Sequence, residues 1–194
     1  SAVAGAQVAG AGNLARGYLV GVQAAGLVNV VEGELVGAQA AGLVNVARGP
    51  AAGLMAAGLG NSAGAIDGVA IAGLGSWVGD LDGAEIAGLA SVARDVEGLQ
   101  LATVNVGRDV EGAQIGVVNV ARHVKGTQIG LVNVSREIDG APVGLVNVTR
   151  GGPRLLVWHE HAVARDPQNL IAGIDVAVKT LVGPVYTQLG FGGD

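Results

Sequence analysis

The chain lacks cysteine, and only 3% of its residues are aromatic and 14% charged. Without cysteine, neither disulfides nor thiolate metal sites contribute to the fold. With so few aromatic residues, the core must be built from Val, Ala, Leu and Ile side chains packed close to the backbone. The formal net charge of −5 offers no basic surface for nucleic acid. These absences exclude a disulfide scaffold and a nucleic-acid-binding protein, and they leave the fold class open.

Glycine is the residue in excess, with 35 among 194 residues. No collagen-like period of three is present, so the excess indicates recurrent turns or closely stacked backbone. Aligned on one glycine, the chain repeats at spacings of 16, 16, 16, 15, 15, 15, 14, 14 and 14 residues, through Gly5, Gly21, Gly37, Gly53, Gly68, Gly83, Gly98, Gly112, Gly126 and Gly140. A period of this kind is the signature of a stacked-repeat architecture.

Polar residues recur in fixed columns of the repeat. The third position holds Gln7, Gln23, Gln39, Gln100, Gln114 and Gln128, with Glu85 once. The centre of each VNV-like triplet holds Asn13, Asn29, Asn45, Asn61, Ser76, Ser91, Asn105, Asn119, Asn133 and Asn147. An arginine often follows three residues later, and an acid often closes the unit. Neighbouring arginines and acids would offset the repulsion between stacked arginines.

A helical interpretation of the repeat fails, because each unit would place two or three glycines inside a helix at about 1 kcal/mol each relative to Ala. Segments such as 114–121 and 128–135 are instead short and rich in β-branched residues. A unit of this length holds two short strands and two turns, whereas a transmembrane hairpin needs about 18 to 22 residues in its strands alone. We therefore predict an all-β fold, a β-solenoid of about ten coils of 14–16 residues over residues 1–150.

Stacking would place identical side chains about 4.8 Å apart along the axis. We expect the Asn column to face inward as a ladder of side-chain amide hydrogen bonds, with Ser76 and Ser91 as small hydrogen-bonding substitutes. Strict alternation would then turn Val118 and Val120 outward. An exposed valine stripe of this kind is typical of an interface, and it favours lateral packing against another solenoid or a membrane-associated partner.

Residues 98–150 resemble a known family. Repeats of the form G-x-Q-I-G-L-V-N-V-A, present here as 112–121 and 126–135, are similar to those of bacterial surface repeat-containing proteins of spirochaetes and myxobacteria. Residues 21–48 match with one extra residue, and residues 51–92 depart most. The resemblance implies an exported, surface-associated protein, and it leaves the biochemical role open.

The repeat stops after Arg150, and residues 151–194 form a second unit. Strand-like segments at 154–163, 169–179 and 183–193 predict a small antiparallel β-meander that caps the last coil, with Trp158 and Tyr186 or Phe191 packed against it. The first repeat begins by Gly5 without a comparable cap. This asymmetry suggests head-to-tail self-association through the N-terminal coil, with an upstream capping segment as the alternative.

Candidate sites for chemistry are few. His159 and His161 would share one face of a strand, the only cluster with metal-ligand residue types, but solvent-facing positions are the favoured interpretation. The acidic unit ends lack the dense Asp-Gly spacing of calcium-binding repeats, and the serines have no His or acid placed for nucleophilic catalysis. No phosphate-binding or dinucleotide motif is present. We expect no catalytic residue and no cofactor.

The sequence therefore favours a non-catalytic structural protein of the cell surface or extracellular space that self-associates into a fibre or layer, with its signal peptide outside this chain. One alternative is a ligand-binding module for ice or polysaccharide, for which only the Gln column offers a regular polar array. Another is a β protein associated with the outer membrane. The uncharged segment 49–66 nearly reaches transmembrane length, but five glycines argue against a spanning helix.

Overall fold

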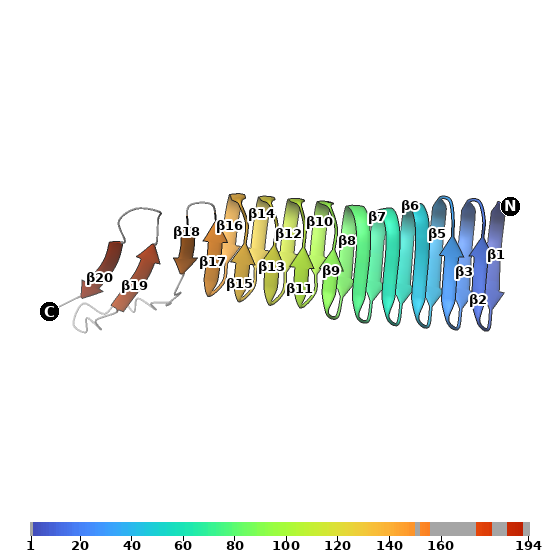
Figure 1. Cartoon of the computed structure of the whole chain (residues 1–194), viewed down its shortest axis with the longest axis horizontal. Coiled ribbons are helices and arrows are strands. Elements are labelled where there is room, and N and C mark those ends of the chain that lie inside the picture. Colours follow the sequence, from blue (N-terminus) through green and yellow to red (C-terminus); the bar gives the residue numbers. More distant parts are fainter. Residues whose placement is uncertain (1, 150–151, 156–173, 180–185, 192–194) are drawn as a thin grey trace, which may run out of the picture.

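The structure, a computed structural model, describes residues 2–149, 152–155, 174–179 and 186–191. Up to Thr149 it is a flattened β-solenoid of about ten coils, which confirms the predicted fold class (Figure 1). Each coil has a long strand and a short strand joined by two turns. Residues of neighbouring coils pair in parallel with their counterparts, such as Gln7 with Gln23 and Asn13 with Asn29.

The long and short strands build two opposite sides of the solenoid. The long strands are β1 (Val3–Ala9), β3 (Leu19–Ala25), β5 (Leu35–Ala41), β10 (Asp95–Leu101), β12 (Asp109–Ile115), β14 (His123–Ile129) and β16 (Glu137–Val143). The short strands are β2 (Gly12–Ala15), β4 (Val28–Val31), β9 (Ala90–Val92), β11 (Val104–Val106), β13 (Val118–Val120), β15 (Val132–Val134) and β17 (Val146–Thr149). In the middle of the array, β6 (Val44–Ala57), β7 (Gly60–Ala72) and β8 (Gly75–Ala87) each join a short strand to the next long strand.

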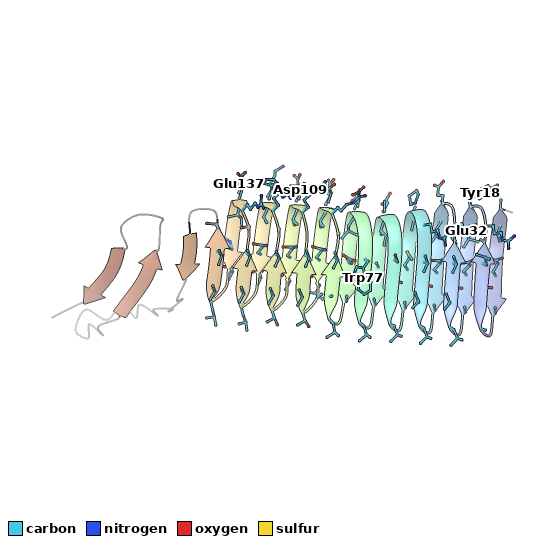
Figure 2. All side chains as sticks on the ribbon, in the orientation of Figure 1. Tyr18, Glu32, Trp77, Asp109 and Glu137 are labelled. Atoms are coloured by element: carbon cyan, nitrogen blue, oxygen red, sulfur yellow. The ribbon has the colours of Figure 1, made fainter. Side chains whose placement is uncertain are left out.

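Four surfaces follow from this arrangement. The outward side chains of the long strands form the long-strand face, and those of the short strands form the short-strand face. The turns from a short strand to the next long strand form the charged edge, at the top of Figure 2, where Tyr18, Asp109 and Glu137 lie. The opposite turns form the leucine edge, defined by Leu27, Leu43, Leu59, Leu74, Leu89, Val117, Leu131 and Leu145.

The shortening from 16 to 14 residues occurs at both edges, one residue at a time. The pairing of β6 with β7 shifts register between Ala47 and Pro50, so the charged edge loses the first residue. The second loss falls at the leucine edge, where Ala102-Thr103 replaces the three-residue turn Ala87-Gly88-Leu89. The sequence alignment shows an extra residue in the longer units only before their second glycine. This accounts for the change at the leucine edge and not for the change at the charged edge.

The repeat glycine is required by two constraints at once. All ten aligned glycines have a positive φ, with Gly37 at 129°. A Cβ at Gly37 would also lie 2.0 Å from the carbonyl oxygen of Gly21 in the preceding coil. Any other residue would therefore be strained and would push the coils apart.

The core has an apolar half and a polar half. Next to the charged edge, side chains such as Leu19, Val31, Leu35 and Ala47 are buried and stack from coil to coil. Further toward the leucine edge, the Gln and Asn columns occupy the interior. The short strands therefore alternate Asn in and Val out, as in β13, where Asn119 is buried and the flanking valines are half-buried.

The parallel order ends at β17, which pairs in antiparallel fashion with β18 (Gly152–Leu155). β18 pairs in turn with β19 (Ile174–Lys179), and β19 pairs with β20 (Tyr186–Phe191), both antiparallel. The remaining parts of the segments 154–163, 169–179 and 183–193, which the sequence predicts as strands, lie outside the described residues. Trp158, His159, Glu160 and His161 lie outside the described residues.

Candidate functional site

The Asn column forms two ladders along the axis. Asn29 donates from Nδ2 to Asn45 Oδ1 at 3.1 Å and to the carbonyl oxygen of Ala40 at 2.8 Å. The same pattern links Asn13 to Asn61 in the first coils and Asn105 to Asn147 in the last. Each Asn amide thus forms hydrogen bonds both to the side chain of the next Asn and to a backbone carbonyl. The buried polar atoms of the column therefore largely have hydrogen-bond partners.

The Gln column runs beside it with the opposite polarity. Gln39 donates from Nε2 to Gln23 Oε1 at 2.8 Å, so Gln amides donate toward the N-terminal coil, whereas Asn amides donate toward the C-terminal coil. Gln100, Gln114 and Gln128 repeat this order. The dipoles of the two ladders therefore oppose each other. Because these glutamines are fully buried, the Gln column does not present a polar array on the surface of these coils.

Both ladders are interrupted in the central coils. Met55 and Ala70 stand in the Gln column, and Ser76 and Ser91 stand in the Asn column. As a result, within the described residues, the buried oxygens Gln39 Oε1 and Asn105 Oδ1 at the borders of the interruption lack hydrogen-bond partners. The central coils are held by backbone pairing and apolar packing, with less help from side-chain amides.

Glu85 lies inside this interruption and is fully buried. Burial raises the pKa of its carboxyl group, and the nearby polar groups of Ser76, Ser91 and Gln100 oppose this rise. Gln100 donates to Glu85 Oε2 at 3.2 Å, and the Ser91 hydroxyl donates to the same oxygen. Ser76 lies beside the carboxyl group, although its Oγ and Glu85 Oε1 do not form a direct hydrogen bond.

The sequence shows Glu85 only as a variant of the Gln column. Its burial depends on the inward direction of that column, which the repeat pattern alone does not decide. A signal was present, because the single Glu of the column coincides with the only two Ser residues in the Asn column. Small hydroxyl side chains leave room for the carboxyl group and can donate to it.

The charged edge carries ion pairs between successive coils. Arg94 reaches Asp80 at 3.4 Å, and Arg108 reaches Asp95 at 2.6 Å in the preceding coil. Arg108 also contacts its sequence neighbour Asp109 at 2.9 Å. The contacts of Arg94 with Asp80 and of Arg108 with Asp95 thus join neighbouring coils. The contact of Arg108 with Asp109 is the sequence-adjacent pairing expected from the repeat. Exposed pairs of this kind contribute little to stability.

The pKa shifts on this edge follow from these pairs. Hydrogen bonds from His123 and then Arg108 lower the pKa of Asp109. Hydrogen bonds to Asp95 and Asp109 raise the pKa of Arg108, and the Glu111 carboxylate raises the pKa of Lys125. Asp109, Arg108 and Lys125 therefore remain charged around neutral pH.

A groove of about 950 Å³ runs along the charged edge. Its walls are two rows of mainly acidic residues, Asp80, Asp95, Asp109, His123 and Glu137 on one side and Asp67, Asp82, Glu97, Glu111, Lys125 and Asp139 on the other. Nevertheless, among the residues that the structure describes, no three His, Asp or Glu side chains are placed to share a metal ion. The groove is an anionic surface rather than a metal centre.

The short-strand face is uncharged over its whole described length. Its outward positions hold Val in most coils, with the exposed Trp77 at its centre (Figure 2). Val118 and Val120 are half-buried, because each packs against the valines of adjacent coils. The face is therefore a flat, apolar sheet surface.

The leucine edge is the second apolar surface. Its side chains remain 38–58% exposed, from Leu43 to Leu145. Beside this edge, on the long-strand face of the first five coils, lies a shallow hollow of about 570 Å³ lined by alanine and glycine between Val8 and Ile71. The sequence analysis did not single out this edge, although a Leu recurs in it. Among the described residues, no helix is long and apolar enough to cross a membrane.

Comparison with protein-family models, with curated proteins and with solved structures finds no match for this chain.

Proposed function

We propose that this protein is a non-catalytic structural component of the bacterial cell surface or extracellular space, and that it self-associates through its apolar faces. One observation carries the proposal. In the described coils, every charged side chain except the buried Glu85 lies on or next to the charged edge. The short-strand face, the leucine edge and the part of the long-strand face beside that edge are left without charge, and soluble proteins rarely leave such extended apolar surfaces uncovered.

The dimensions of the uncharged surface fit this role. Ten coils at about 4.8 Å span about 45 Å, and five residues across a strand and turn span about 16 Å. One such strip therefore covers about 700 Å², close to the roughly 800 Å² per partner of a stable protein interface. The location outside the cell is part of the proposal and is supported by the resemblance of residues 98–150 to surface repeats.

The proposal is tested by sedimentation of the purified chain over a wide concentration range, together with negative-stain microscopy. We expect concentration-dependent oligomers. A variant with Val106→Glu and Val134→Glu, which places charge on the short-strand face, should reduce them, whereas the control Asp82→Asn on the charged edge should not. A chain that stays monomeric at all concentrations would refute self-association. Long single-solenoid filaments would favour head-to-tail contacts over lateral ones.

A further inference from the structure

We infer that the leucine edge and the adjacent hollow form a self-complementary contact that pairs two copies of this chain side by side and parallel. This inference rests on the proposed self-association and specifies its geometry. The leucine edge is a ridge, because the side chains of Leu27, Leu43, Leu59 and Leu74 project from consecutive turns and are 38–48% exposed.

The hollow is the matching receptor surface. In the first five coils, the outward row of the long-strand face nearest the leucine edge runs Val8, Ala24, Ala40, Ala56 and Ile71. The three alanines, together with turn residues such as Gly26 and Gly42, leave space between the bulkier ends. Ridge and hollow share the axial spacing of the coils, so in coils two to four a leucine of one copy meets an alanine of the other.

The hollow and the ridge coincide only in part of the array. From coil five onward, the outward row is bulky, with Ile71, Ile86 and Leu101 in place of alanine. The turn at the leucine edge loses one residue two coils later, at Ala102-Thr103, where the leucine of the ridge is absent. Leucine ridge and alanine hollow therefore occur together in coils two to four.

These matches identify the occupant as a second copy. The contact strip has no charged side chain over the described coils, and the same three coils carry both the ridge leucines and the hollow alanines. Another copy in the same direction reproduces both the spacing and the position of these three coils. A lipid surface or an unrelated partner would match neither.

The direction of pairing follows from geometry. For each ridge to lie in the other hollow, the two long-strand faces must face each other and the two leucine edges must point in opposite directions. A rotation of 180° about an axis parallel to the solenoid achieves both and preserves the coil order. Like coils therefore lie beside like coils, and the two charged edges lie at the outer margins of the dimer.

Single-cysteine variants test this arrangement directly, because the natural chain has no cysteine. A mixture of Leu43→Cys and Ala40→Cys proteins should form a disulfide-linked heterodimer under mild oxidation, since both positions lie in coil three. Leu43→Cys mixed with Ile115→Cys should not, because coils three and eight would meet only in an antiparallel pair. Preferential crosslinking of the second mixture would overturn the parallel arrangement.

Equilibrium sedimentation gives an independent measure. Leu43→Ser with Leu59→Ser should raise the dimer dissociation constant by at least about tenfold, while the control Arg48→Ser on the charged edge should change it little. Circular dichroism checks that each variant folds. Oligomers that persist unchanged with the ridge variant would overturn this contact while leaving self-association intact. A monomeric wild-type chain would overturn both, and flotation of that monomer with uncharged phosphatidylcholine vesicles would assign the ridge to lipid instead.

Discussion

The first three coils and the last four have the same interior but different surfaces. Both regions stack Asn and Gln ladders beside apolar columns. Residues 1–50, however, carry two arginines and two glutamates, whereas residues 95–149 carry six acids and four Arg or Lys residues. The coils of the second region are also shorter by two residues. Their comparison shows that the interior fixes the coil, while turn length and surface charge vary independently of it.

Between these regions, the Asn and Gln side-chain ladders are interrupted in the central coils. Met55, Ala70 and Glu85 replace Gln, and Ser76 and Ser91 replace Asn, where the coil length passes through 15 residues. The change in length and the loss of amides coincide, which suggests that the ladders define two blocks joined by a less constrained segment. Substitutions can test whether the two blocks are equivalent.

The largest effect is expected at the glycine column, which both blocks share. Gly37→Ala in the first block and Gly112→Ala in the second would each place a Cβ 2.0–2.1 Å from a carbonyl oxygen at positive φ. We expect each to lower the free energy of unfolding by at least about 3 kcal/mol in urea titrations. The control Gly10→Ala, which has no heavy atom within 4 Å of its Cβ, should be nearly neutral. Unequal losses would mean that the blocks differ in their backbone packing.

A smaller loss is expected from the Asn ladders. Asn119→Ala removes the donor to Asn133 Oδ1 at 2.8 Å and leaves that buried oxygen without a partner. We expect a loss of about 2 to 3 kcal/mol, and the same from Asn29→Ala in the longer coils. Asn61→Ala should cost less, because Asn61 ends its ladder and donates only to backbone oxygens. Equal losses at all three positions would show that the ladder contributes nothing beyond its backbone contacts.

The smallest change is expected at Glu85, and it should depend on pH. A carboxyl group whose pKa is raised by folding contributes stability below its ordinary value of 4.5, and loses that contribution as the pH rises through the raised value. Glu85→Gln should therefore stabilise the chain by about 1 kcal/mol or more near pH 8 and by less near pH 4. The amide introduced by this substitution would accept from Gln100 and donate toward Ser76.

The reverse change in the second block serves as the control for Glu85. Gln114→Glu would place a carboxyl group between Gln100 and Gln128 without nearby serines, and it should destabilise the chain most at high pH. Unfolding midpoints measured across pH for both variants would check this. A Glu85→Gln variant with no pH-dependent gain would show that the Glu85 carboxyl group is not desolvated.

Much of the fold could be predicted from the sequence, because the same local sequence pattern occurs in each of about ten coils. The glycine spacing predicts the coils and their register, and the Asn column predicts an inward polar position. The inward direction of Gln23 could not be predicted, since alternation fixes relative directions within a strand and the turn between strands resets them. For the same reason, the leucine edge and its hollow were missed.

The sequence by itself determined an all-β stack of about ten coils, since only glycine fits a positive φ beneath a neighbouring carbonyl and only identical residues stack in register. The tertiary structure decided which columns are inside, where each coil loses a residue, and how charge is confined to one edge and the adjoining part of the long-strand face. These properties depend on how the two strands of a coil pack against each other. Which side chains of each strand point into the core is set only when the turns bring the two strands together.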